Sequence, residues 1–286
     1  MVYGSQMMNC NELIRKSLAY RKSILRMIYK ADAGHIGGSL SCVDILNVLY
    51  NYVMNVSPGN FCSPDRDRYF HSKGHSSQAL YAVLCDKGFF GEEMLDFLSQ
   101  YQSELFGHPT RLVPGVEHNT GALGHGLSVG VGTALAGKMD QKHYHVFVMI
   151  GDGELAEGSN WEGMMAAAHY VLDNLVVILD RNTLQISGKT EEVMSLEPIE
   201  EKLQAFGFSV ASIDGNSISE LIEIFSNIPF EEGKPNMIIA NTVKGKGISF
   251  MENQAKWHHR VPSEEEYKLA MIELEEIEKT LVADDV

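Results

Sequence analysis

The chain has 286 residues, enough for one large domain or two small ones with a real hydrophobic core. Apolar residues make up 44% of the chain and charged residues 21%, which is typical of a globular protein and not of a disordered one. Lys and Arg total 23 against 38 Asp and Glu, so the formal net charge is −15. This balance argues against nucleic acid or an anionic membrane as the main partner.

Cysteine usage and apolar run length indicate the compartment. The four cysteines form no C-x-x-C pair, and their spacing does not indicate zinc, so free thiols in a reducing compartment are expected. The first residues contain no apolar core of a signal peptide. The longest apolar runs, such as Val146–Ile150, are far too short to span a membrane. We therefore expect a cytoplasmic protein.

The first half of the chain predicts helices separated by loops. Leu13, Leu18 and Leu25 lie near one stripe of an amphipathic helix. In chain order, the sequence predicts a helix over Leu13–Tyr29, a Gly/Ser-rich turn over Ala33–Ser41, a helix over Val43–Tyr52, a Pro- and Asp-rich segment over Ser63–Ser77, a helix over Gln78–Lys87, and a loop followed by a helix over residues 107–132.

The clearest pattern is a strand–helix–strand unit. His145–Ile150 is a short apolar run that ends in Gly-Asp-Gly, and Leu175–Asp180 is a second one. Between them, Ser159 and Glu162 form a capping-box signature that opens a helix through about Val171. Runs that are apolar throughout are typical of a sheet buried on both faces. The pattern predicts a βαβ unit with parallel strands and a right-handed crossover.

The rest of the chain extends the same architecture. Apolar runs at Phe208–Ile213 and Met237–Thr242 predict further strands, with a helix near Ser219–Phe225 between them. An acidic closing helix over about 263–281 begins with a second capping box, Ser263 and Glu266. Its predicted inner face consists of Tyr267, Ala270, Leu274, Ile277 and Leu281. The expected fold class is α/β, with a mostly parallel β-sheet, helices on both faces and no domain break.

Asp152 and Asn182 follow two neighbouring strands of this unit. The carboxyl edge of an open α/β sheet is where such folds bind ligands, so both side chains are expected to face one site. Carboxylate and amide oxygens suit Mg²⁺ or Ca²⁺ better than zinc. A backbone carbonyl near Leu184, a diphosphate and water would complete the shell, and Gly153 leaves room for a phosphate. Taken alone, Gly-Asp-Gly also describes a plain turn.

Ordered motifs then reveal a family resemblance. The stretch GDGELAEGSNWEGMMAAAHYVLDNLVVILDRN resembles the thiamine diphosphate motif, which opens with GDG and closes with Asn. AGHIGGSLS, SPDRDRYFHSKGHSSQALYAVL, HPTRLVPGVEHNTGALGHGLSVGVG and NTVKGKGISFMENQAKWHH resemble successive transketolase motifs in the same order. The match covers nearly all of the chain and corresponds to the amino-terminal, diphosphate-binding part of transketolase. The chain thus resembles the N-terminal subunit of a split transketolase, with residues 1–286 forming one thiamine diphosphate-binding domain.

The resemblance implies a set of ligands for thiamine diphosphate and its metal. The implied metal is Mg²⁺, with Ca²⁺ or Mn²⁺ as alternatives. The implied metal ligands are Asp152, Asn182 and the carbonyl of Leu184. The implied cofactor contacts are His75, Gly121, Ala122, Leu123, Gly153, Asn182 and Lys244.

The resemblance also implies the reaction. A transketolase moves a two-carbon ketol unit from a ketose phosphate to an aldose phosphate, and the cofactor carries the nucleophile, so no Ser or Cys nucleophile is needed. His35, His108 and His258 match histidines that face the substrate, and Glu157 matches an acidic residue that links paired active sites. Histidines that titrate near neutrality suit the proton transfers of such a reaction.

Two departures from the family pattern matter. Many relatives have glycine after the histidine of the W-H motif, where this chain has His259, so either His258 or His259 is expected to point inward. The activating glutamate of the family lies in the pyrimidine-binding domain, which this chain lacks. A separate C-terminal subunit is therefore the expected partner, in a heterotetramer that acts on sugar phosphates in the pentose phosphate pathway or a dedicated route. His118 and His125, adjacent to motifs, stay unassigned.

Three alternatives compete with this interpretation. Gly124–Gly130 imitates a dinucleotide-binding fingerprint, but no apolar strand precedes it, as that fingerprint requires. Other thiamine enzymes, such as the α subunit of a 2-oxo acid dehydrogenase, also carry GDG and Asn, and a deoxyxylulose phosphate synthase would be a longer chain. The third alternative is a non-catalytic half that only binds the cofactor or regulates.

Overall fold

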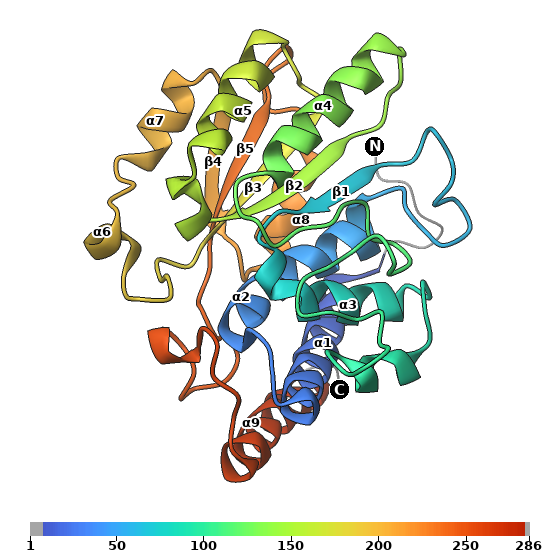
Figure 1. The fold of residues 1–286 in the computed structure, drawn as a ribbon, viewed down its shortest axis with the longest axis vertical. Coiled ribbons are helices and arrows are strands. Elements are labelled where there is room, and N and C mark those ends of the chain that lie inside the picture. The colour runs from blue at the N-terminus through green and yellow to red at the C-terminus, as the bar shows by residue number, and fades with distance from the viewer. Residues whose placement is uncertain (1–7, 284–286) are drawn as a thin grey trace.

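A parallel sheet forms the centre of the molecule (Figure 1). The computed structural model describes residues 8–283, and within them one five-stranded sheet has all its strands parallel. The predicted βαβ unit is confirmed, because its two strands pair directly in parallel register. The strands, in spatial order, are β1 (Arg68–His71), β2 (Val146–Gly151), β3 (Leu175–Arg181), β5 (Asn236–Asn241) and β4 (Ser209–Asp214).

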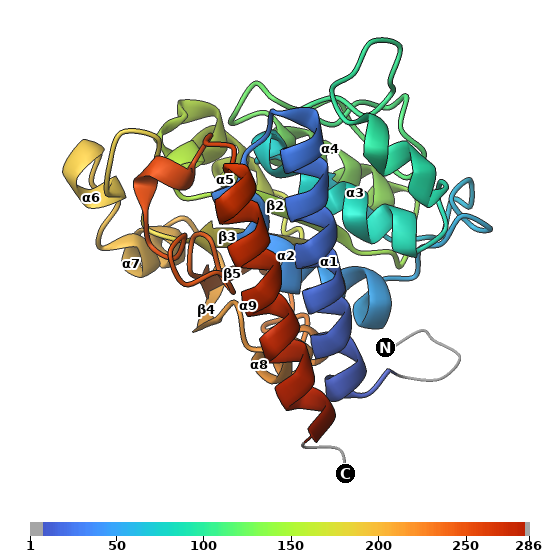
Figure 2. The same ribbon diagram turned by 90° about the horizontal axis from the view of Figure 1, so that it is seen from below.

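Helices cover both faces of this sheet, as predicted. On one face lie α4, α5 and α7, and on the other lie α1, α2, α3 and α8, with α9 packed along α1 (Figure 2). Across the described part of the chain, no helix is both long and apolar enough to cross a membrane. The helices are α1 (Cys10–Ala31), α2 (Ile36–Val48), α3 (Ser77–Asp86), α4 (Gly126–Met139), α5 (Gly158–His169), α6 (Thr190–Val193), α7 (Ile199–Ala205), α8 (Ile218–Ser226) and α9 (Glu264–Ala283).

The sheet separates two hydrophobic cores. Along β2, Phe147 and Met149 join the core beneath α1 and α2, whereas Val146, Val148 and Ile150 join the core beneath α4 and α5. Every residue of β2 and β3 is buried. Successive side chains of a strand point to opposite faces, so a strand covered on both faces must be apolar at every position. This explains why the strands appear as continuous apolar runs in the sequence.

The Gly/Ser-rich turn expected over residues 33–41 is wrong for most of its length, because α2 begins at Ile36. Every residue of α2 is buried. A Cβ at Gly37 would lie 2.8 Å from the carbonyl oxygen of Trp257, and one at Gly38 would lie 3.0 Å from the ring of His75. The glycines are therefore needed for close packing of the helix and not for a turn, and tertiary contacts override their low helix propensity.

Strand β1 was not predicted. It is four residues long and lies inside a segment rich in Pro, Asp and Arg, where hydrophobic periodicity has no signal. Its backbone pairs with β2, from Arg68 opposite Val146 to His71 opposite Met149. Strand β1 forms because β2 supplies the backbone hydrogen bonds that pair with it. Its formation therefore depends on tertiary structure.

The two predicted capping boxes had different outcomes. The box at α9 is confirmed, since the Glu266 amide donates to Ser263 Oγ at 3.2 Å and the Ser263 amide donates to Glu266 Oε2 at 2.9 Å. The box at α5 is wrong, because that helix begins at Gly158 and Ser159 Oγ instead donates to the Gly124 carbonyl at 2.8 Å. The hydroxyl thus joins a loop to the helix.

The predicted inner face of α9 is only partly confirmed. Ala270 and Leu274 are fully buried, and Tyr267 stacks on Tyr29 of α1 with ring centroids 4.3 Å apart. Leu281 also packs against this core. Ile277, however, is 39% exposed, so four of the five predicted residues form the inner face.

A buried ion pair joins the carboxyl ends of the strands. The Lys73 ammonium pairs with the Asp180 carboxylate, and both side chains are almost completely buried. Lys73 Nζ also donates to the Gly38 carbonyl at 3.1 Å, and Asp180 accepts from Ser41 Oγ at 2.7 Å and from the Thr242 hydroxyl. Burial alone would raise the pKa of Asp180, but the adjacent lysine lowers it below the ordinary value. The pair links α2 to β1, β3 and β5.

Replacement of Lys73 by methionine should strongly destabilise the fold. The substitution leaves the Asp180 carboxylate buried without its counter-ion, so we expect the free energy of unfolding to fall by about 3–5 kcal/mol. Urea denaturation followed by circular dichroism measures this change. The matched control is Lys268→Met, which breaks an exposed pair with Glu264 and should lower the free energy of unfolding far less. Equal effects of the two substitutions would contradict the assigned role.

Candidate active site

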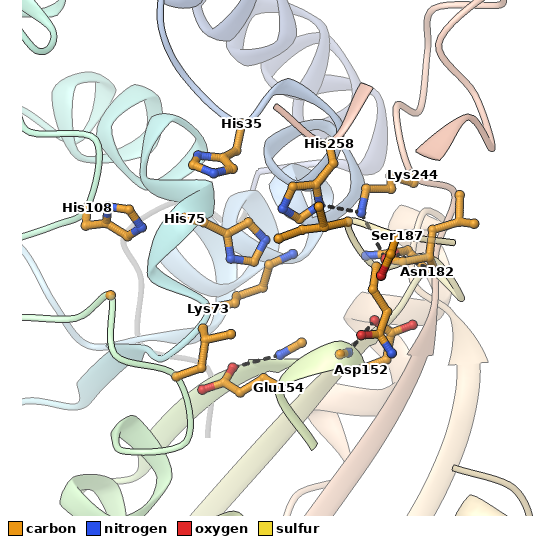
Figure 3. Close-up of a pocket in the computed structure, with 17 residues that line it drawn as sticks. His35, Lys73, His75, His108, Asp152, Glu154, Asn182, Ser187, Lys244 and His258 are labelled. Atoms are coloured by element: carbon orange, nitrogen blue, oxygen red, sulfur yellow. Dashed lines mark hydrogen bonds between the residues drawn. The ribbon is translucent and has the colours of Figure 1, made fainter. Parts of the chain in front are cut away.

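A cavity of about 330 Å³ lies at the carboxyl edge of the sheet, where the loops after the strands converge (Figure 3). This is the edge at which the sequence placed the ligand site. Asp152 follows β2, Asn182 follows β3 and Lys244 follows β5. The lining residues are His35, Lys73, His75, His108, Gly121, Leu123, Gly151, Asp152, Gly153, Glu154, Asn182, Leu184, Gln185, Ile186, Ser187, Lys244 and His258.

The three expected metal donors lie together in this cavity. Asp152 Oδ2 accepts from the Thr183 amide at 2.6 Å, and its Oδ1 accepts from the Gly153 amide at 2.8 Å. Asn182 Oδ1 accepts from the Leu184 amide at 3.3 Å. These backbone bonds orient the carboxylate and the amide, and each oxygen keeps a lone pair for another partner.

The electrostatics at Asp152 favour a cation. Burial and then the nearby Asp180 carboxylate raise the pKa of Asp152, and Arg181, whose nitrogen is 3.4 Å from Asp152 Oδ2, opposes the shift. A divalent cation would relieve the cost of holding this carboxylate charged. With the Leu184 carbonyl, the donors are one carboxylate, one amide oxygen and one peptide oxygen, so the residues fit a hard, oxygen-preferring metal.

The glycines of the cavity leave space for an anion. A Cβ at Gly153 would meet only the Gln185 side chain, at 3.5 Å, so packing within the chain does not require a glycine there. A side chain would instead take space from the cavity. Gly121 has φ +137°, and a Cβ there would press on the His108 ring at 3.2 Å. Ala122, which was expected beside Gly121 and Leu123 in the site, does not line the cavity.

Lys244 is the cation nearest the expected metal donors. Its ammonium donates to the Leu184 carbonyl at 2.9 Å and lies 2.9 Å from His258 Nδ1. Burial and the positive charge of Lys73 lower the pKa of Lys244 to about 8. The side chain therefore connects the metal donors with the histidines above them.

Five imidazoles gather at one side of the cavity. The ring of His35 is their centre, and its centroid lies 5.4 Å from those of His75 and His258, 5.8 Å from that of His108 and 4.5 Å from that of His259. His258 lines the cavity, whereas His259 is exposed beside His35. Within residues 8–283, no group of His, Cys, Asp and Glu side chains is arranged to bind a metal, so the imidazoles do not form a zinc-like site.

The expectation that these histidines titrate near neutrality is wrong. Burial, together with the charges of neighbouring histidines and Lys244, lowers the pKa of His35 to about 4. Burial and Lys244 lower the pKa of His258 to about 3, and burial lowers the pKa of His75 well below its ordinary value. Burial disfavours the charged form of an imidazole, and nearby positive charges disfavour it further, so both lower its pKa. Near pH 7 these rings are neutral hydrogen-bonding groups.

Glu154 was missed by the sequence analysis. Its buried carboxylate lines the cavity and accepts hydrogen bonds from Ser72 Oγ, from the Gly124 amide at 2.9 Å and from the Gly151 amide at 3.0 Å. The sequence feature that could have identified Glu154 is its position directly after Gly-Asp-Gly. Glu157, which was expected in the site, is instead exposed at the start of α5, outside the cavity.

Four further residues of the cavity lining were not predicted from the sequence. They are Lys73, Gln185, Ile186 and Ser187. The last three lie in an irregular loop after β3, where no periodic pattern marks a function. The unassigned histidines, His118 and His125, do not line the cavity.

Known proteins resemble this chain in sequence and fold. Residues 15–275 match the family model described as transketolase, thiamine diphosphate binding domain. An apulose-4-phosphate transketolase subunit from Phocaeicola vulgatus is 52% identical over 91% of this chain and 92% of its own length. A 6-deoxy-6-sulfo-D-fructose transketolase subunit from a Clostridium species is 43% identical over 92% of this chain and 96% of its own length.

Longer transketolases match over part of their length. The crystal structure of transketolase from Campylobacter jejuni superposes with a TM-score of 0.88 at 32% identity, over 93% of this chain and 43% of that one. These similarities confirm the predicted fold and family, and they decide against the nicotinamide enzyme and the 2-oxo acid dehydrogenase subunit. The chain belongs to the transketolase family and corresponds to its thiamine diphosphate-binding, amino-terminal part.

Proposed function

We propose that this chain is the cofactor-binding subunit of a two-chain transketolase, with residues 1–286 forming one domain. The complex transfers a two-carbon ketol unit from a ketose phosphate to an aldose phosphate. The observation that supports this most is the cavity that is lined by Asp152, Asn182 and Leu184 together with a group of histidines. Relatives that match this chain over nearly their whole length are named as transketolase subunits, which supports a second chain.

The cavity divides into a metal end and a cofactor wall. In this proposal Asp152, Asn182 and the Leu184 carbonyl hold Mg²⁺, with Ca²⁺ or Mn²⁺ as substitutes. When bound, thiamine diphosphate supplies the nucleophilic carbon that the side chains of this chain do not offer. The proposed cofactor contacts are His75, Gly121, Leu123, Gly153, Asn182 and Lys244, all of which line the cavity, whereas Ala122 does not.

The histidines act on the sugar. The Lys244 ammonium donates toward His258 Nδ1, so the ring proton of His258 is on Nε2. As neutral rings, His35, His108 and His258 give and accept hydrogen bonds at sugar hydroxyls and hold them for proton transfer. Glu157 is exposed at the start of α5 and so is available to a partner chain, which agrees with its proposed role in linking paired sites.

The partner completes the site. We propose a separate C-terminal subunit that supplies the activating glutamate, in a cytoplasmic heterotetramer. The two subunits named for apulose-4-phosphate and for 6-deoxy-6-sulfo-D-fructose match this chain over nearly their whole length. Their names favour a modified ketose in a dedicated route over the pentose phosphate pathway.

Native purification from the source cells tests this proposal. We expect a second chain of similar length to co-purify, and two-carbon transfer to require both chains, thiamine diphosphate and Mg²⁺. Transfer is measured as aldose consumed and new ketose formed, by mass spectrometry. A homo-oligomer that binds thiamine diphosphate without turnover, even with the partner added, would instead favour the non-catalytic half.

Asp152→Ala should remove the metal. The substitution takes away the one carboxylate among the proposed ligands, so we expect metal affinity to fall at least about 100-fold and transfer to be lost with it. Equilibrium dialysis with Mn²⁺ measures binding separately from activity, and thermal unfolding checks the fold. Asp140→Ala, at an exposed carboxylate after α4, is the control. Unchanged Mn²⁺ binding in Asp152→Ala would disprove the metal assignment.

The buried imidazoles should make stability depend on pH. The pKa of His35 is about 4 in the folded chain against an ordinary value of 6.5, so the unfolded chain binds more protons between these values. Stability should therefore fall as the pH drops from about 6.5 to about 4. Urea unfolding across this range should show a shallower decline for His35→Asn. His143→Asn, at an exposed histidine, should leave the decline unchanged, and an unchanged decline in His35→Asn would contradict the lowered pKa.

A further inference from the structure

Arg181 is a buried arginine that the proposed function does not yet use. It is the last residue of β3 and directly precedes the proposed metal ligand Asn182. Its side chain is 6% exposed and does not line the cavity. A charged side chain is rarely buried unless other groups pair with it, so the hydrogen bonds of Arg181 indicate what it does.

The Arg181 guanidinium binds four side chains. Its Nη1 lies 3.4 Å from Asp152 Oδ2 and donates to Thr190 Oγ1 at 2.6 Å. Its Nη2 donates to Glu191 Oε1 at 2.8 Å and to Glu197 Oε1 at 2.9 Å. Arginine suits this arrangement because its planar group presents several N–H donors in fixed directions. Arg181 thus joins Asp152, which follows β2, to the segment that follows β3.

That segment begins with a closed loop, residues 183–190, which we call the metal-site loop. Its two ends meet, because the Thr190 amide donates to the Thr183 carbonyl at 2.9 Å. Inside it, Leu184 and Lys189 form an antiparallel bridge. The loop carries the Leu184 carbonyl, one of the proposed metal ligands, and its tip lines the cavity. The position of the loop therefore decides where that carbonyl lies.

Both ends of the metal-site loop are held against Asp152. The Thr183 amide donates to Asp152 Oδ2 at 2.6 Å, and Arg181 contacts the same oxygen while it binds Thr190. The Asp152 carboxylate and the Leu184 carbonyl follow different strands, so their relative position depends on these bonds. Ligands that are fixed before a metal arrives need not be ordered when it binds, which favours binding.

The positive charge of Arg181 is offset by its own partners. A guanidinium alone beside Asp152 would oppose a divalent cation. Glu191 and Glu197 pair with the same guanidinium, so one positive charge stands against three carboxylates and the group keeps a net negative charge. The effect of Arg181 on metal binding should therefore come from the positions that it fixes.

On the basis of the function proposed above, we propose that Arg181 is a positioning residue for the metal. It orients the Asp152 carboxylate and holds the metal-site loop beside it, so that this carboxylate and the Leu184 carbonyl meet one divalent cation. Because Arg181 does not line the cavity, it acts through these two ligands and not by direct contact with the metal or the cofactor.

Mn²⁺ binding tests this inference separately from turnover. Equilibrium dialysis of the full chain, with its partner subunit and thiamine diphosphate, gives the Kd for Mn²⁺. Arg181→Met should raise this Kd about tenfold, the usual effect of removing a group that orients a metal ligand. Arg181→Lys keeps the charge but cannot bridge four side chains, so it should recover little of the affinity. Thr190→Val leaves Arg181 in place and removes one of its anchors on the loop, so it should also raise the Kd.

Hydrogen exchange without Mn²⁺ locates the change. Residues 183–197 should exchange faster in Arg181→Met than in the wild type, while the amides of β2 and β3 keep their protection. The matched control is Arg26→Met, which removes an exposed arginine that pairs with Glu92, and it should alter neither the Kd nor the exchange.

The possible results separate this inference from the proposed function. If the wild type binds Mn²⁺ and Arg181→Met binds it equally or more tightly, the inference is overturned and the proposed function stands. Complete recovery in Arg181→Lys would also overturn it, because charge alone would then explain the effect. If Arg181→Met loses protection throughout the sheet, Thr190→Val decides, and an unchanged Kd there overturns the inference. Failure of the wild type to bind Mn²⁺ would overturn the proposed metal site and this inference together.

Discussion

The buried pair of Lys73 and Asp180 is the interaction on which the site depends. Charged groups so far from water are costly unless each finds its partner and further hydrogen bonds. Here the partners come from α2 and from the ends of three strands, so the pair forms only when these elements meet. Asp180 also accepts from the side-chain amide of Asn182 at 3.2 Å, which leaves the oxygen of Asn182 to accept from the Leu184 amide at 3.3 Å. The cavity therefore forms next to the hydrogen-bonded pair of Lys73 and Asp180.

Burial also decides the chemistry available to the histidines. Burial and neighbouring charges lower the pKa values of His35, His75, His108 and His258 below the ordinary value of an imidazole. As neutral rings, these four histidines are donors and acceptors for hydroxyl groups. The chain as a whole has a formal charge of −15, yet the cavity contains two lysines, Lys73 and Lys244. Overall charge thus argues against nucleic acid as the main partner without deciding what a local site binds.

The strands and most helices could be predicted because their signals are local. Val146–Ile150 and Leu175–Asp180 are apolar at nearly every position, which only a sheet covered on both faces requires. The errors have one cause. Residues 36–41 looked like a turn because of Gly37 and Gly38, and β1 looked like a loop because of its polar surroundings. In both places, contacts with distant segments outweigh local propensity, and those contacts are not visible in the sequence.

The same division holds for the site. The sequence by itself determined the family, the position of the site at the carboxyl edge of the sheet, and the residues that carry motifs, because Asp152, Asn182 and Lys244 each directly follow a strand or lie near its end. Only the tertiary structure decided that Glu154 and Lys73 line the cavity, that Glu157 does not, and that His258 lines it while His259 is exposed and does not. The physical reason is that burial and hydrogen bonding depend on how segments far apart in the chain pack together, and these determine both where a side chain points and whether it carries a charge.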